Sequence, residues 1–430
     1  MRNRLPGALL CLILSLAVLA GCAPRNANPG EGGQAQRRKP DVNGIVNLMT
    51  GIQVEKTAVH PPDAGAADAA ADFAVRLLQQ SYRPDGNTLL SPLSILYALG
   101  MTANGARGDT LAQMEGALGL STAQLNACLH AYAQGLSTGE GGELRLANAI
   151  WFKDDPAFSV QQAFLAANAR WYGADLLQAP FDGRTLRAIN AWVSDHTAGL
   201  IPEILDEIPG DALMYLVNAL AFDAQWQTVY REDQVGQGVF TGEDGVGRSV
   251  EMMHSDESRF LQDGQATGFV KPYAGGRYAF VALLPNEGVS VGEYISGLTG
   301  PKLRGLLAAA QDTTVVATLP KFSYEYGIEL KEPLMALGMR DAFDGERADL
   351  SGIGAYPNGN LAISRVLHKT RIDVDERGTR AGAATAVEIK CMSAPLEQKT
   401  VCLDRPFLYL LVDEQTGLPL FIGAAMEVGA

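Results

Sequence analysis

The chain has little of what catalytic and metal-binding proteins usually need. Its 430 residues contain only five cysteines and five histidines, and the histidines show no H-E-x-x-H spacing. No CxxC pair or Cys/His cluster is present, which argues against a metal site. Basic residues are in the minority, with 34 Lys and Arg against 48 Asp and Glu. The resulting charge of −14 argues against nonspecific binding to nucleic acid or to anionic lipid surfaces.

The apolar run near the start of the chain is too short to span a membrane comfortably. It covers residues 8–20, follows two arginines and has the flanks of a signal peptide. It ends in Leu19-Ala20-Gly21-Cys22, which resembles the bacterial lipoprotein signal, where cleavage precedes a cysteine that becomes lipidated. We therefore expect residues 1–21 to be a lipoprotein signal peptide and Cys22 to carry a lipid that anchors an extracytoplasmic protein to the bacterial cell envelope. An ordinary signal peptide with an incidental cysteine is the alternative.

Residues 22–65 have the composition of a flexible tether. They are rich in Gly, Pro, Asn, Ala and charge, with one short apolar patch around Ile45 to Val54. A flexible segment of about 40 residues has a root-mean-square reach of roughly 35 Å, enough to hold a domain clear of a membrane surface. We expect the folded part to begin near Ala66.

Helix signals come early in the chain and strand signals come late. Helices are predicted from Ala66, from Ser91-Pro92, where serine caps the helix and proline takes its first position, and after Asp109-Thr110. Strand-like segments follow at 144–152, 213–222, 277–284, 313–319, 408–412 and 420–423. Because regular βαβ alternation is missing, the pattern predicts an α+β domain.

Two short motifs match functional signatures only in part. Residues 135–139 match the G-x-S-x-G nucleophile elbow, but a helical pattern precedes Ser137, whereas the elbow requires a strand-to-helix turn. Residues 373–378 carry carboxylates near a glycine but lack the further ligands of a calcium loop. A hydrolase that uses Ser137 is kept only as an alternative. We expect no enzymatic activity, no metal and no cofactor.

A period-two pattern runs through a segment with the composition of a loop. Residues 376–395 read ERGTRAGAATAVEIKCMSAP, and every second residue from Thr379 to Cys391 is small or apolar. One face of such a segment suits a core and the other tolerates water, as in a strand. The glycines and alanines meanwhile keep the segment mobile.

A series of segments, in order along the chain, resembles the serpin superfamily. They are NTLLSPLSI at 87–95, GARGDT at 105–110, ANAIWF at 147–152, INAWVSDHTAGLIPEIL at 189–205, LVNALAFDAQW at 216–226, VEMMH at 250–254, YAFVALLPNEG at 278–288, LPKFSYEYGIELKEPLMALGM at 319–339, AISRVLHKTRIDVDERGTRAGAATAV at 362–387 and DRPFLYLLVDEQTGLPLFIG at 404–423. The resemblance implies a serpin domain over residues 66–430, with helices packed on a large central sheet, smaller sheets, and an exposed reactive loop at about 376–403.

In that family a target protease attacks the loop, whose amino-terminal part then inserts as a new central strand of the large sheet. The resemblance implies these hinge residues: Glu376, Gly378, Thr379, Ala381, Ala383, Ala384 and Thr385. It points to Met392–Ser393 as the reactive bond, since Met392 lies sixteen residues after the first hinge residue. Met392 suits elastase-like or chymotrypsin-like pockets. Lys390 is the rival site and favours trypsin-like enzymes.

The resemblance also assigns residues where the sheet opens. Ser91, Ser94, Asn218 and His368 match a polar cluster under the opening, and Trp226 matches a tryptophan beside the loop. A satisfied buried network and a plain core aromatic are the ordinary explanations. Glu376 is expected to pair with a basic residue that the sequence does not identify.

The implied partners are serine proteases, trapped by a monomer through suicide inhibition, with no nucleic-acid partner. A non-inhibitory serpin that acts as a carrier or binding protein is the main alternative. Cys391 and Cys402 flank the predicted bond, and a disulfide between them would prevent its two sides from separating. Whether they pair stays open.

Overall fold

The computed structural model describes residues 41, 43–53, 64–136, 142–210, 212–355, 360–379 and 398–429. Several predicted functional residues lie outside the described residues: Cys22, Ser137, Ala381, Ala383, Ala384, Thr385, Lys390, Cys391, Met392 and Ser393. In the described part of the chain, no helix is both long and apolar enough to cross a membrane.

Helices dominate the first half of the domain. They are α1 (Ala64–Ser81), α2 (Pro92–Ala103), α3 (Gly108–Leu118), α4 (Thr122–Gln134), α5 (Gln162–Tyr172) and α6 (Gly183–His196), followed later by α7 (Val291–Gly297), α8 (Gly300–Ala308) and α9 (Lys331–Ala336). The predicted start of α2 is confirmed, because Ser91 accepts a hydrogen bond from the amide of Ser94 and Pro92 is the first helical residue.

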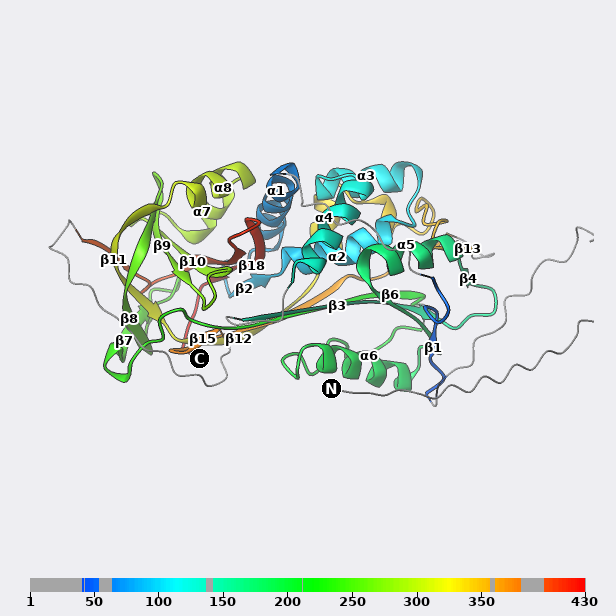
Figure 1. Ribbon diagram of the computed structural model, residues 1–430, viewed down its shortest axis with the longest axis horizontal. Coiled ribbons are helices and arrows are strands. Elements are labelled where there is room, and N and C mark those ends of the chain that lie inside the picture. The colour runs from blue at the N-terminus through cyan, green and yellow to red at the C-terminus, as the bar shows by residue number, and fades with distance from the viewer. Residues whose placement is uncertain are drawn as a thin grey trace, which may run out of the picture. The chain divides into compact units, whose positions relative to one another are not determined.

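The large sheet has seven strands. Their order is β1 (Val46–Asn47), β5 (Asp175–Ala179), β3 (Glu143–Lys153), β6 (Met214–Gln225), β15 (Gly378–Thr379), β14 (Leu367–Val374) and β12 (Phe322–Glu329). Helix α6 lies on one face of this sheet, while α2 and α5 lie on the other (Figure 1). Strand β6 divides its side chains accordingly, since Leu220 and Phe222 belong to the main core and Tyr215 and Val217 to a second core with α6.

A second sheet has nine strands. It runs β16 (Lys399–Cys402), β11 (Gln311–Pro320), β8 (Gly247–Gln262), β9 (Ala266–Pro272), β10 (Tyr278–Pro285), β17 (Phe407–Asp413), β18 (Leu418–Ala425) and β2 (Thr88–Leu90), with β7 (Val235–Thr241) paired to β8. A small sheet joins β13 (Gly354–Ala355) to β4 (Ser159–Val160). The predicted α+β class is confirmed. Each of the six predicted strand segments coincides with a strand (β3, β6, β10, β11, β17 or β18), although the segments at 213–222 and 277–284 begin one residue before β6 and β10.

Part of the segment predicted as a tether belongs to the domain instead. Val46 pairs with Gln178 of β5, which makes β1 an edge strand of the large sheet. Leu48, Met49 and Ile52 are partly buried against the main core. The apolar patch seen in the sequence is therefore packed rather than solvated, because burying apolar surface is favourable by about 25 cal/mol per Å². Residues 43–53 thus belong to the folded domain, and the prediction that they form part of a flexible tether ending at residue 65 is wrong.

Candidate functional site: the loop hinge and the opening of the large sheet

The first residues of the predicted reactive loop lie inside the large sheet. Strand β15 lies between β6 and β14 and pairs antiparallel with both. Thr379 is opposite Ala224 on β6 and Val374 on β14. The sequence predicted an exposed loop from about residue 376, but only 3% of Thr379 is exposed. The hinge therefore begins as a short strand that is already paired.

A tight turn carries the chain from β14 into β15. One carboxylate oxygen of Asp375 accepts hydrogen bonds from the amides of Arg377 (2.7 Å) and Gly378 (3.1 Å). This is the geometry in which an aspartate side chain stabilises a turn two residues on. The amide of Asp375 donates in return to the carbonyl of Gly378, at 3.0 Å. Of the carboxylates at residues 373–378, that of Asp375 therefore stabilises the turn.

Gly378 is required by the close approach of β6. A Cβ at this position would lie 2.1 Å from the carbonyl oxygen of Ala224 and 2.8 Å from Cα of Gln225. Both are backbone atoms, which cannot move aside without disturbing the sheet. Only glycine therefore fits between the strands here.

Two residues that follow β6 hold the hinge backbone. Trp226 donates from its amide to the carbonyl of Arg377 and from its indole Nε1 to the carbonyl of Asp375, both at 2.8 Å. The amide of Tyr230 donates to the carbonyl of Glu376, at 3.0 Å. Trp226 is thus more than a core aromatic, because its indole is bonded to the hinge.

The hinge side chains are held as well. Tyr273 stacks on Trp226, with ring centroids 4.5 Å apart, and its hydroxyl lies 2.5 Å from Oγ1 of Thr379. Thr379 is therefore bonded through its side chain and through both neighbouring strands. The sequence predicted Thr379 as an inward-facing hinge residue but gave no sign that Tyr273 contacts it.

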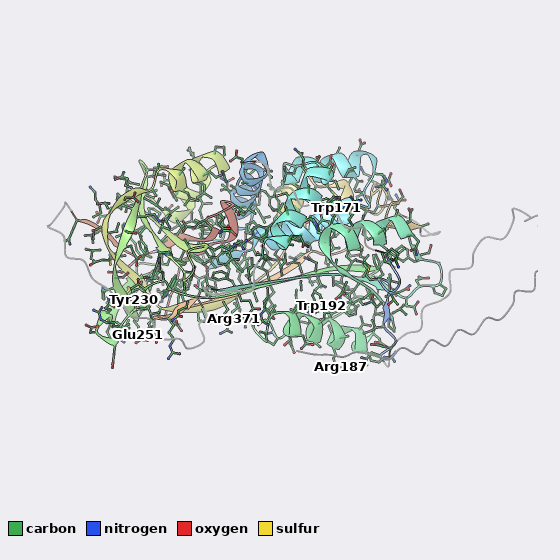
Figure 2. The ribbon with its side chains drawn as sticks, in the orientation of Figure 1. Trp171, Arg187, Trp192, Tyr230, Glu251 and Arg371 are labelled. Atoms are coloured by element: carbon green, nitrogen blue, oxygen red, sulfur yellow. The ribbon has the colours of Figure 1, made fainter. Side chains whose placement is uncertain are left out.

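The basic partner expected for Glu376 is Lys321, whose Nζ lies 2.8 Å from the carboxylate. Lys321 also contacts Glu251, at 3.3 Å, and Glu251 is among the residues labelled in Figure 2. The hydrogen bond from Lys321 lowers the pKa of Glu376. Burial opposes the charge of Lys321, but its bonds to the two carboxylates outweigh this and raise its pKa.

The structure brings the predicted polar cluster together further along the sheet. His368, on β14, accepts a hydrogen bond at Nε2 from the amide of Ser91, at 3.0 Å. Ser94 donates to Oδ1 of Asn218 on β6, whose Nδ2 in turn donates to Oδ1 of Asn148. Asn148 lies on β3 and was not predicted, although a buried amide within the apolar segment ANAIWF was a usable signal.

His368 is neutral in this environment. Its Nε2 accepts a hydrogen bond, so the imidazole proton resides on Nδ1. Burial lowers its pKa to about 4. The cluster therefore joins α2 to the strands on both sides of the opening through neutral hydrogen bonds, which are less costly to break and remake than buried charge.

The remaining predicted positions are less informative. Cys402, on β16, is half-buried, and burial raises the pKa of its thiol. Its candidate partner Cys391 lies outside the described residues. Within the described ranges no group of three or more His, Cys, Asp or Glu side chains is arranged to hold a metal ion.

Comparison with known proteins identifies the class to which this fold and hinge belong. The family profile described as Serpin (serine protease inhibitor) matches residues 68–428. A serpin-like protein of Thermococcus kodakarensis is 30% identical over 432 residues, covering 97% of this chain and 98% of its own. The leukocyte elastase inhibitor of Bos taurus is 33% identical over 360 residues, covering 80% of this chain and 93% of its own.

Solved structures agree. The crystal structure of the thermophilic serpin tengpin in its native state has a TM-score of 0.86 and 45% identity, and covers 89% of this chain and 100% of its own. Tengpin in its latent state has a TM-score of 0.77 and 44% identity, and covers 88% of this chain and 100% of its own. The chain belongs to the serpin family, whose members are known as protease inhibitors rather than enzymes.

Proposed function

We propose that this serpin inhibits serine proteases as a suicide substrate, with Met392–Ser393 as its reactive bond. The protease serine attacks the carbonyl of Met392, the peptide bond breaks, and Ser393 leaves as a free amine. The loop after Thr379 then inserts between β6 and β14 and carries the acylated protease with it. Insertion adds ladder hydrogen bonds and apolar burial, so the starting fold is kinetically rather than thermodynamically stable.

The observation that carries this proposal is the register of β15. Because β15 is antiparallel to both neighbours, each further loop residue faces one residue earlier on β6 and on β14. Continuing from Thr379, Thr385 comes opposite Asn218 and His368, the two cluster residues on the strands that flank the opening. Insertion thus supplies a hydroxyl where the polar cluster has hydrogen-bonding groups.

The side chains on the inward face support insertion. Ala381, Ala383 and Thr385 follow Thr379 at two-residue steps, so in an inserted strand they share the face that holds buried Ile372 of β14. Small side chains enter such a core without clashes, whereas bulky or charged ones would not. A non-inhibitory carrier is therefore the weaker candidate.

The specificity residue suggests the class of target. Met392 is unbranched and apolar, which suits elastase-like and chymotrypsin-like pockets. A relative that is named as a leukocyte elastase inhibitor supports this choice. Attack at Lys390 by a trypsin-like enzyme is the alternative, and it leaves an inserting strand two residues shorter.

Substitution at both sites distinguishes these targets. We expect Met392→Arg to abolish the complex with elastase, because a charged side chain does not fit that pocket, and Lys390→Ala to leave the complex intact. Denaturing electrophoresis with sequencing of the released peptide measures both. If Lys390→Ala loses inhibition of trypsin while Met392→Arg keeps inhibition of elastase, the assignment of the reactive bond is wrong.

The leader supports a location outside the cytoplasm. The proposal assigns lipid attachment to Cys22 after removal of residues 1–21, which anchors the inhibitor to the cell envelope. Metabolic labelling with palmitate in a bacterial host tests this, with Cys22→Ala as the control. Equal labelling of the two proteins would exclude a lipid at Cys22.

A further inference from the structure

A buried ion pair lies beneath the residues that hold the hinge. Lys271 on β9 and Glu257 on β8 are only 2% and 8% exposed, and Nζ of the lysine lies 2.7 Å from Oε1 of the glutamate. Burial lowers the pKa of Lys271, and Glu257 acts in the opposite direction. Replacing such a pair by apolar groups of similar volume is often neutral or stabilising. Stability alone therefore gives no reason for a buried charge at this point.

The lysine contacts the two residues that hold the hinge backbone. Its Nζ lies 4.2 Å from the ring centroid of Tyr230 and 5.4 Å from that of Trp226. A desolvated ammonium at this distance is attracted to the ring face, which restricts where each ring can lie. Tyr230 and Trp226 are the same residues whose N–H groups donate to the carbonyls at positions 375–377.

The glutamate is linked through Ser255 to the hydroxyl end of the Tyr230 ring. Ser255 donates to Oε1 of Glu257, at 2.6 Å, and its Oγ lies 3.3 Å from the hydroxyl of Tyr230. Burial, and to a lesser degree Glu257, raises the pKa of Tyr230, so its hydroxyl keeps its proton. The face of Tyr230 is thus contacted by Lys271, and its hydroxyl end by Ser255, which is hydrogen-bonded to Glu257.

We propose that Lys271 and Glu257 are positioning residues for loop insertion, a role that rests on the proposed function. The pair fixes the rings of Trp226 and Tyr230, and these keep β15 paired as the start of the inserting strand. Without the pair, strand growth after cleavage starts from a looser hinge, and more acyl-enzyme is hydrolysed before trapping. The reactive bond is untouched, so the rate of protease attack stays the same.

The first test needs no protease. The double variant Lys271→Met/Glu257→Gln removes both charges and avoids leaving one of them unpaired. We expect hydrogen exchange to become several-fold faster in peptides covering 226–230 and 375–379, with exchange in β10 and β17 unchanged and the melting temperature not lowered. Lys302→Met, at an exposed lysine of α8, is the control. Unchanged exchange at the hinge, or an equal increase throughout the sheet, overturns the proposal.

The second test separates positioning from inhibition itself. We expect the double variant to consume several-fold more inhibitor per protease molecule than the wild type, at an unchanged second-order rate of cleavage. If the number of inhibitor molecules consumed per protease molecule is unchanged, the positioning role is overturned even if hydrogen exchange at the hinge rises. If the wild type forms no complex, the proposed inhibitory function is what fails, and hydrogen exchange alone then decides whether the pair orders the hinge.

Discussion

Lys321 and Glu376 form an ion pair that ties the residue after β11 to the first residue of the predicted reactive loop. The side chains are 24% and 36% exposed, so their contribution to global stability is small, about 0–1 kcal/mol. The importance of the pair lies in its position, since the carbonyl of Glu376 accepts a hydrogen bond from Tyr230 and those of its two neighbours accept hydrogen bonds from Trp226. It therefore acts on the hinge rather than on the whole fold.

Replacing Lys321 should return the pKa of Glu376 to its usual range. Lys321 lowers the pKa of Glu376, so the stabilisation is present above the unfolded pKa of about 4.3 and is lost as pH falls through the folded value. We expect a carbon-13 titration of the Glu376 carboxyl to show a pKa below its usual range in the wild type and a normal one in Lys321→Met. The same pKa in both proteins, with Lys302→Met as control, would contradict the pairing.

Gly378→Ala should expel β15 from the sheet. The added Cβ would meet the carbonyl oxygen of Ala224, so the hinge can stay paired only at the expense of a backbone clash. Gly327→Ala on β12 is the matched control, because nothing lies within 4 Å of its Cβ. We expect hydrogen exchange of Trp226 and Tyr230 to rise in the first variant only. Equal protection in both variants would mean that β15 is not held between the strands.

His368 should make the fold sensitive to acid. Its pKa of about 4 lies below the unfolded value near 6.5, so protons favour the unfolded chain as pH falls between these values. Between pH 7 and pH 4 we expect the free energy of unfolding to fall by on the order of 3 kcal/mol more in the wild type than in His368→Gln. Urea denaturation at both pH values measures this. Identical pH dependence in the two proteins would show that His368 is not buried neutral.

Thr385→Arg should turn the inhibitor into a substrate. If the register of β15 continues into the proposed inserted strand, position 385 comes opposite Asn218 and His368, where an arginine would bury a charge. Insertion should then stall and the protease be released, while cleavage of the loop proceeds at its normal rate. Thr385→Ser keeps the hydroxyl and should trap normally. A stable complex with Thr385→Arg would place the insertion register elsewhere.

The sequence predicted the parts of the fold whose signals are local. The start of α2 needed only Ser91 and Pro92, and the buried strands β10, β17 and β18 form short apolar runs. Strands β8 and β12 were not predicted from pattern, because they mix buried and exposed positions irregularly. Strand β14 does alternate between buried and more exposed positions, but its buried face includes the polar residues His368 and Thr370, so its sequence shows no apolar alternation. The packing of residues 43–53 was also missed, since a short apolar patch does not reveal which surface covers it.

The hinge residues were predicted only through the family resemblance, and their contacts were found only in the structure. Resemblance pointed to Trp226 and Glu376, but their partners lie far away along the chain and carry no motif of their own. Lys321 follows β11, and Lys271 looks like an ordinary surface lysine until β8 and β9 pair around it. These contacts depend on which strands pair across long stretches of the chain. That pairing cannot be read from a single sequence.

The most direct test of the proposed protease trapping is to mix the domain from residue 41 onward with pancreatic-type elastase. The products are followed by denaturing electrophoresis and mass analysis. We predict a complex that survives denaturation, together with release of a fragment that begins at Ser393. Complete cleavage of the loop with no stable complex would contradict the account, since the protein would then be a substrate or a non-inhibitory serpin.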